Sequence, residues 1–211
     1  MTALLKDKSK RKTWLFGYGS LINTKSRNNT SKIDIVYPIR IRGYKRIWNR
    51  KADKLDDRQA KLGIIPSDNI NDTVNGVIYQ VNSDSLSSFD ERELLWGYNR
   101  LQIPVDNIEI IKGDTYGLTN IDKDDHVFAY ILNVLKDIDK LEINRMNEQV
   151  YVDTCLTGCM EYGNDFAIEF IKTTYDWRND WIMDRFGDDG LSVRQNYLWE
   201  LNKNDCKQID E

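Results

Sequence analysis

The sequence predicts an α+β fold, in which a closed or nearly closed mixed β-sheet surrounds one main helix and is followed by a helical C-terminal part. Up to residue 132, short runs rich in β-branched and aromatic residues alternate with turn residues, which is typical of strands. One strong helical pattern interrupts them at residues 83–93. From about Asp137 onward, the apolar residues recur at helical spacing, so helices are expected there.

The composition is that of a folded protein without a polyanionic partner. At 211 residues, the chain fits one large domain or a core with an appendage. Hydrophobic residues make up 40% of it and include six Trp, eleven Tyr and six Phe, which is enough for a packed core. The formal charge of -4 gives no basic footprint for nucleic acid or an anionic membrane. We therefore expect neither partner.

The sequence suggests three parts. Residues 1–12 are predicted to form a flexible basic tail, residues 13–135 the β-rich core, and residues 136–211 a helical extension packed on that core. No run approaches the ~18 apolar residues of a membrane span, and the tail lacks the apolar stretch of a secretory signal. A cytoplasmic protein is therefore expected.

The predicted strands are broken at residues that suit loops and edges. Residues 33–48 predict one bent strand or two, with a break at Gly43 and an edge or bulge at Pro38. Residues 61–65 and 74–81 flank a turn-forming segment and together predict a hairpin. Further strands are predicted at residues 98–105, 108–111 and 127–132.

The main helix carries a carboxylate on its apolar stripe. Residues 83–85 offer N-cap side chains, and Leu86, Phe89 and Glu93 follow at helical spacing. Glu91 should face solvent. Glu93 is expected either to reach water at the helix end or to lie in a pocket where desolvation raises its pKa and makes it a usable acid-base.

A glycine-rich loop follows the apolar run of residues 14–16. Residues 17–21, GYGSL, allow backbone N–H groups to point into a concavity that suits an anion such as a carboxylate. The spacing lacks the pattern of a dinucleotide loop and the ending of a P-loop. The loop is therefore either a ligand-binding turn or a plain tight turn.

Few residues are available for nucleophilic or metal chemistry. His126 is the only histidine, so a His-rich metal site is excluded and no local base is evident for Ser20, to which we assign binding rather than attack. Cys155 and Cys159 have a spacing that suits one apolar face of a helix, and with Cys206 they are expected to be reduced and mostly buried. No metal site is predicted.

Several motifs together resemble a known family. Residues 16–22, FGYGSLI, resemble the signature loop of the γ-glutamylcyclotransferase superfamily, which includes the ChaC, γ-glutamylamine cyclotransferase and AIG2-like branches. Residues 90–93, DERE, followed by Tyr98, resemble its D-x-R-E…Y segment. Residues 74–79 are similar to the strand placed before that segment, and residues 43–48, GYKRIW, to the G-Y-x-R-x-W strand of some members. The resemblance predicts that superfamily's mixed β-barrel.

The resemblance implies an enzyme that needs no cofactor. In this family the α-amine of a γ-glutamyl group attacks its own γ-carbonyl, which gives 5-oxoproline and releases an amine or peptide. Glu93 would take a proton from the α-ammonium and give one to the leaving nitrogen. Backbone amides at Gly19, Ser20 and Leu21 would hold the substrate and polarise its carbonyl.

Three tyrosines are predicted to line the substrate pocket by the same resemblance. They are Tyr18, Tyr98 and Tyr151, and each has an ordinary core or surface position as its alternative. The chain departs from the family at residues 94–96, LLW. Family members usually have a glycine soon after the Glu, whereas here these three residues come before Gly97 and can reshape the pocket mouth.

The sequence leaves the substrate and part of the function open. The substrate can be glutathione, a γ-glutamyl amino acid, a γ-glutamylamine or a γ-glutamyl group on a larger molecule. The alternative to an enzyme is a catalytically silent binding or regulatory protein with the same fold. The C-terminal extension can serve as a lid or a subunit contact, and either a monomer or a homodimer is expected.

Overall fold

The computed structural model describes residues 11–50, 59–111, 121–132, 146–177 and 181–182. Its strands are β1 (Thr13–Gly17), β2 (Tyr37–Arg42), β3 (Tyr44–Arg50), β4 (Gln59–Pro66), β5 (Thr73–Val81), β6 (Tyr98–Gln102), β7 (Ile108–Ile110), β8 (His126–Leu132), β9 (Met146–Glu148), β10 (Thr174–Tyr175) and β11 (Trp181–Ile182). Its α-helices are α1 (Thr24–Asn28), α2 (Ser83–Leu94), α4 (Gln149–Met160) and α5 (Asn164–Lys172), and its 3-10 helices are η1 (Ser20–Ile22) and η2 (Val105–Asn107).

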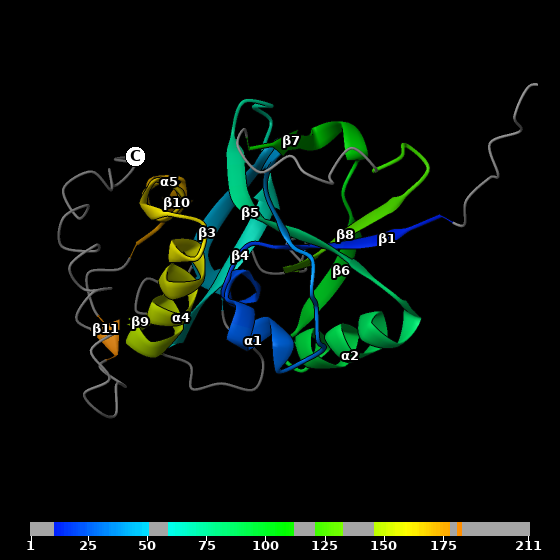
Figure 1. The fold of residues 1–211 in the computed structure, drawn as a ribbon. Coiled ribbons are helices and arrows are strands. Elements are labelled where there is room, and N and C mark those ends of the chain that lie inside the picture. Colours follow the sequence, from blue (N-terminus) through cyan, green and yellow to red (C-terminus); the bar gives the residue numbers. More distant parts are fainter. Residues whose placement is uncertain (1–10, 51–58, 112–120, 133–145, 178–180, 183–211) are drawn as a thin grey trace, which may run out of the picture.

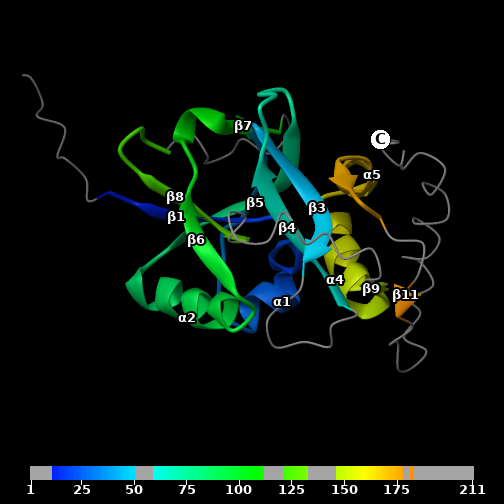
Figure 2. The ribbon, with the colours of Figure 1, turned by 180° about the vertical axis from the view of Figure 1, so that it is seen from behind.

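These strands form two sheets. In the described part of the chain, a six-stranded sheet has the order β6-β8-β1-β5-β2-β7 and a five-stranded sheet the order β10-β3-β4-β9-β11. Strand β1 pairs parallel with β8 and antiparallel with β5, so the larger sheet is mixed. The α+β class with a mixed sheet is therefore confirmed, but the sheet is not closed into a barrel, as Figures 1 and 2 show.

The chain passes from one sheet to the other between β2 and β3 and again between β4 and β5, and these two connections meet at one corner. Gly43 joins β2 to β3 with a φ of 78°, a left-handed conformation that glycine adopts at little cost. Its N–H donates to the Asp72 carbonyl at 2.8 Å, and its own carbonyl accepts from the Ser67 N–H at 2.9 Å. These bonds hold the turn after β4 against Gly43. The hairpin predicted from β4 and β5 is wrong, because β4 pairs with β3 whereas β5 pairs with β1 and β2.

The prediction for residues 33–48 is confirmed from Tyr37 onward by strands β2 and β3, whereas residues 33–36 form no strand. The segment forms two strands that separate at Gly43 rather than one bent strand. The register of β2 with β7 runs from Ile39 to Ile41 and stops short of Pro38. Pro38, which has no N–H to donate, is paired with Val77 of β5 and lies at an edge of the pairing with β7 only.

Helix α2 packs beneath the larger sheet and ends beside the glycine-rich loop. It contacts β5 and β6, and Figure 1 shows it next to α1 on that side of the molecule. Its N-cap is Asn82, whose side chain accepts from the Ser85 N–H at 2.8 Å, rather than one of the predicted residues 83–85. The cap and the buried Phe89 fix both the start and the rotation of the helix.

The C-terminal part contributes helices and also strands. The predicted apolar faces are buried in α4 and α5, which pack on each other, and α4 also packs on η1. Strands β9, β10 and β11 come from the same part and pair with β3, β4 and each other, which the sequence did not predict. Residues 1–10 of the basic tail and residues 183–211 lie outside the described residues, and the boundary at residue 135 stays a prediction.

Arg46 of β3 joins the two sheets inside the core. Its side chain is fully buried, with 0% of its surface exposed. It donates to the Asn75 carbonyl and side-chain oxygen at 2.8 Å, to the Tyr18 carbonyl at 3.2 Å and to the Phe170 carbonyl at 3.0 Å. Burial lowers the pKa of the guanidinium to about 10, so it remains charged at neutral pH. One side chain therefore ties β5, α5 and the loop after β1 to the smaller sheet.

Replacing Arg46 is expected to destabilise the whole fold. Arg46→Leu should lower the free energy of unfolding by about 3 to 5 kcal/mol, because several buried oxygens lose their donor. Urea denaturation followed by circular dichroism measures this change. Arg42→Leu is the matched control, since Arg42 is exposed and donates to one exposed carbonyl, and its effect should stay near 0.5 kcal/mol. Equal losses in both variants would contradict the role given to Arg46.

Candidate active site

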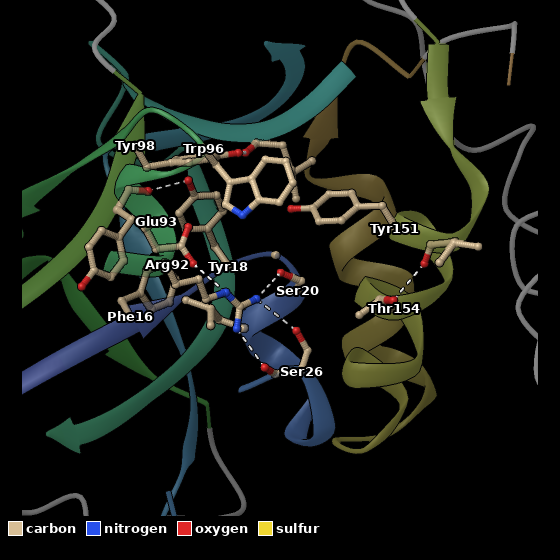
Figure 3. Close-up of a pocket in the computed structure, with 15 residues that line it drawn as sticks. Phe16, Tyr18, Ser20, Ser26, Arg92, Glu93, Trp96, Tyr98, Tyr151 and Thr154 are labelled. Carbon is tan, nitrogen blue, oxygen red and sulfur yellow. Dashed lines mark hydrogen bonds and ion pairs between the residues drawn. The ribbon is translucent and has the colours of Figure 1, made fainter. Parts of the chain in front are cut away.

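One cavity of about 320 Å³ lies between the end of α2, the loop after β1 and helix α4 (Figure 3). It is lined by Phe16, Tyr18, Gly19, Ser20, Leu21, Ser26, Leu62, Arg92, Glu93, Trp96, Tyr98, Tyr130, Val150, Tyr151 and Thr154. The seven residues singled out from the sequence all line it: Glu93, Tyr18, Gly19, Ser20, Leu21, Tyr98 and Tyr151. Its walls thus come from segments far apart in the sequence, and the roles of these residues stay predictions.

Glu93 is the buried carboxylate of this cavity. Helix α2 places it one turn after Phe89 and buries both side chains, whereas Glu91 is exposed, as predicted. Burial raises the pKa of the Glu93 carboxyl to about 7, and the Arg92 charge works in the opposite direction. The last turn of a helix carries negative partial charge, which also disfavours the carboxylate form. Glu93 can therefore take up or release a proton near neutral pH.

Arg92 forms an ion pair with Glu93 and makes four hydrogen bonds through its two Nη groups. Its Nε is 3.2 Å from Glu93 Oε1. Its Nη1 donates to the Ser26 carbonyl at 2.8 Å and to Thr30 Oγ1 at 2.7 Å. Its Nη2 donates to Ser20 Oγ at 3.2 Å and to Ser26 Oγ at 3.1 Å. The guanidinium thus ties the end of α2 to the loop and α1, and Figure 3 shows it below the Glu93 carboxylate.

Every backbone carbonyl of residues 18–22 is hydrogen-bonded, which fixes the conformation of the loop. Arg46 Nη1 donates to the first of these carbonyls at 3.2 Å, and Arg27 Nη1 donates to the last two at 2.9 Å. The other two accept from backbone N–H groups one turn further along. Arg27 is itself 1% exposed, so two buried arginines hold this loop.

Gly19, Ser20 and Leu21 of the same loop line the cavity. Gly19 is the N-cap of η1, and Ser20 and Leu21 are its first two residues. The first N–H groups of a helix have no acceptor within that helix, and successive N–H groups of this kind form an anion-binding concavity. The predicted binding role of Gly19, Ser20 and Leu21 is therefore compatible with the geometry of the loop.

Two tyrosines form walls whose hydroxyl groups are anchored to the backbone. Tyr18 Oη donates to the Tyr130 carbonyl at 2.6 Å, and Tyr98 Oη donates to the Leu62 carbonyl at 2.6 Å. A phenol that donates its proton in this way can meet a ligand through its ring or as an acceptor. Tyr18 and Tyr98 therefore shape the cavity and are held rigidly.

Tyr151 brings helix α4 into the cavity. A Cβ atom on Gly19 would lie 3.1 Å from Tyr151 Oη, so the hydroxyl and the loop backbone are in close contact. The approach depends on Gly158, where a Cβ atom would lie 2.4 Å from the backbone nitrogen of Asn23. The ring packs edge-on against Trp48 with centroids 5.8 Å apart, and burial raises the pKa of the phenol well above its usual value of 10. Tyr151 is therefore neutral at physiological pH.

Several lining residues were not singled out from the sequence. They are Ser26, Arg92, Trp96, Val150 and Thr154, together with Phe16, Leu62 and Tyr130. A signal existed for Arg92, which lies within the DERE segment, and for Trp96, which lies within the departure at residues 94–96. Val150 and Thr154 lie one turn apart on α4, where no motif marks them. Trp96 lines the cavity, so part of the departure lies in its wall, and its effect on the pocket mouth stays a prediction.

The remaining reactive side chains lie outside this cavity. Cys155 and Cys159 are free and buried in α4, as predicted, and Cys206 lies outside the described residues. His126 and Ser20 are not brought together, since the former is not among the residues lining the cavity. Among the described residues, no three His, Cys, Asp or Glu side chains gather as a metal site would require.

No helix in the described part of the chain is both long enough and apolar enough to cross a membrane. The absence of nucleic-acid and membrane partners stays a prediction.

Several solved structures are similar in fold to this chain, and two of them serve as examples. A gamma-glutamyl cyclotransferase aligns with a TM-score of 0.57 at 14% sequence identity, over 89% of this chain and 99% of that chain. An uncharacterized protein from Homo sapiens aligns with a TM-score of 0.56 at 16% identity, also over 89% of this chain and 99% of the other. At these identities the likeness shows the fold alone. No curated protein sequence matches the chain significantly.

The sequence itself matches a family model described as ChaC-like protein over residues 13–156. The matched segment runs from β1 to within α4, so it includes the glycine-rich loop, Glu93 and Tyr151. Because it spans more than half of the chain, the protein belongs to the ChaC-like family, one of the branches that its motifs predicted.

Proposed function

We propose that this protein is a γ-glutamylcyclotransferase, which converts a γ-glutamyl compound into 5-oxoproline and a free amine or peptide. The observation that carries the proposal is the buried Glu93, whose pKa of about 7 suits an acid-base and which lines one cavity with the anchored loop of residues 18–22. Membership of the ChaC-like family supports it. We also keep cytoplasmic localisation as a proposal.

In the proposed reaction, Glu93 handles the protons. As a carboxylate it accepts a proton from the α-ammonium, and the neutral amine attacks the γ-carbonyl carbon, which forms the ring C–N bond. Glu93 then donates that proton to the leaving nitrogen while the original C–N bond breaks. The ring nitrogen gives its surplus proton to the regenerated carboxylate, which passes it to solvent. A single carboxylate with a pKa of about 7 suits both directions of transfer.

The loop would position the substrate and stabilise negative charge. The N–H groups of Gly19, Ser20 and Leu21 suit the α-carboxylate of the glutamyl group or the oxygen of the tetrahedral intermediate. Because the nucleophile belongs to the substrate, no protein nucleophile is required. Ser20 Oγ accepts from Arg92, which agrees with a binding role for this hydroxyl rather than attack.

The walls would hold the glutamyl chain in a bent conformation suited to ring closure. Tyr18, Tyr98 and Tyr151 surround the cavity and are each held by packing or hydrogen bonds. Holding reacting atoms in near-attack geometry contributes much of the rate acceleration in intramolecular reactions. The rigid aromatic walls therefore serve positioning.

The proposal is tested by incubating the purified protein with glutathione, γ-glutamyl amino acids and γ-glutamylamines. Mass spectrometry measures 5-oxoproline, with Glu93→Gln as the matched variant. Release by the wild type and a loss of 100-fold or more in the variant are expected, on the order of what general acid-base catalysis contributes. No product from any substrate would contradict the proposal and favour the catalytically silent binding protein. Equal product from both would contradict the role of Glu93.

The pH dependence of the reaction is expected to follow Glu93. The base must be ionised, and burial raises its pKa to about 7, so kcat/KM should rise as the pH increases through about 7. Steady-state kinetics between pH 5 and pH 9 on one substrate measure this rise of kcat/KM with pH. A limb centred near 4.5, the ordinary glutamate value, would show that burial does not set the pKa of the catalytic group.

The same carboxyl should make stability depend on pH. Its pKa is about 4.5 when exposed and about 7 when folded, so the folded state holds the proton more tightly between these values. The free energy of unfolding of the wild type, relative to Glu93→Gln, should therefore fall as the pH rises from 4.5 to 7. A fall of about 3 kcal/mol corresponds to this shift. Urea unfolding of both proteins at several pH values measures it, and a pH-independent difference would contradict the burial of an ionisable Glu93.

We expect that adding a side chain at Gly19 impairs catalysis. In Gly19→Ala, the added Cβ would lie 3.1 Å from Tyr151 Oη and 3.5 Å from Leu62 Cδ2, inside the cavity. We expect kcat/KM to fall roughly 10- to 100-fold because the substrate is displaced, while the melting temperature changes little. Kinetics and calorimetry on the same preparation separate the two effects. Unaltered kinetics would show that the substrate does not approach Gly19.

A further inference from the structure

The mouth of the cavity carries exposed apolar side chains. Trp96 and Val150 both line the cavity, yet they remain 39% and 44% exposed. In Figure 3, the Trp96 indole comes from the end of α2 and the Tyr151 ring from α4, and both point toward the same space. Large apolar groups exposed at the rim of a pocket are typical of a surface that a ligand covers.

Trp96 lies in the segment of residues 94–96 that departs from the family pattern. Leu94 and Leu95 precede it and are 59% and 57% exposed, but neither lines the cavity. Helix α2 ends here, and Gly97 turns the chain back into β6 with a φ of 75°. Of the three consecutive apolar residues, Trp96 is therefore the one presented to a ligand.

The charges at the cavity indicate which ligands suit this mouth. Among the described residues that line it, Arg92 is the only cation and Glu93 the only anion. Arg92 already forms an ion pair with Glu93, and its two Nη groups make four hydrogen bonds, as described above. A carboxylate on the leaving group would therefore have to displace an existing partner of Arg92. A neutral apolar group meets no such cost, because Trp96 and Val150 can cover it.

We propose that Trp96 and Val150 form the leaving-group subsite, and that this subsite selects γ-glutamylamides whose amine carries an apolar or aromatic body and no carboxylate. This inference rests on the proposed function and specifies its substrate class. The bond that breaks joins the γ-carbon to the nitrogen of that amine, and the amine leaves with the proton donated by Glu93. Dipeptide leaving groups such as cysteinylglycine, which end in a carboxylate, suit the subsite less well.

Three matched probes test the selectivity of the subsite. γ-Glutamyl-2-phenylethylamide has an aromatic body without a carboxylate, γ-glutamylphenylalanine adds the carboxylate, and γ-glutamylmethylamide lacks the aromatic body. We expect kcat/KM for the phenylethylamide to exceed that for each of the others by roughly tenfold, on the scale of one buried aromatic contact. A preference for γ-glutamylphenylalanine, or equal values for all three, would overturn the inference.

Variants at the rim locate the selectivity. Trp96→Ala should lower kcat/KM for the phenylethylamide roughly tenfold and that for the methylamide less than about threefold. Trp96→Phe should restore most of the difference. Leu95→Ala is the matched control, since Leu95 is also apolar and exposed but does not line the cavity, and should change neither value. Equal losses for both substrates in Trp96→Ala would overturn the assignment.

A failure of the proposed function is distinguishable from a failure of this inference. If no probe releases 5-oxoproline, the proposed function fails, and calorimetric binding of the phenylethylamide then decides the subsite. Weaker binding to Trp96→Ala than to the wild type would support the subsite, and equal binding would overturn it. If 5-oxoproline is released without the expected preference, the proposed function stands and the subsite assignment fails.

Discussion

The buried guanidinium of Arg46 is the constraint on which the arrangement of the molecule depends. A charge removed from water is tolerated only when its donors are satisfied. In the described chain, the oxygens that satisfy it belong to Asn75 in the larger sheet, Phe170 in α5 and Tyr18 in the glycine-rich loop, with Thr173 and Thr174 beside them. These segments are therefore held in one relative position, although the strands themselves divide into two sheets.

The candidate active site uses the same kind of interaction at its edge. Buried arginines hold three of the carbonyl groups of the loop and so fix the conformation of its backbone beside the cavity. Across the cavity, burial outweighs the Arg92 charge and raises the pKa of Glu93 to about 7. The loop and the carboxylate therefore complement each other, since one suits negative charge and the other exchanges protons. Each of them is held in position by residues from other segments of the chain.

Local patterns in the sequence predicted much of this site. The strand before the loop and the rotation of α2 follow from spacing within one segment. Periodicity placed Glu93 on the apolar stripe of α2 but left open whether it reaches water or is buried. The pairing of β4 with β3 instead of β5 depends on hydrogen bonds between Gly43 and a distant turn, which no local pattern encodes. The contribution of Val150 and the close approach of Gly158 to the loop are likewise long-range packing effects. Family resemblance, rather than periodicity, indicated Tyr151.

The central claim is that Glu93 is a buried carboxyl group that changes its charge near neutral pH within a preformed cavity. Carbon-13 NMR titration of the glutamate side-chain carboxyl carbons measures this directly, and the resonance missing from Glu93→Gln identifies the residue. The account predicts a titration midpoint near 7 for this resonance. A midpoint near 4.5, the value of an exposed glutamate, would contradict it, since such a group would be ionised throughout the physiological range.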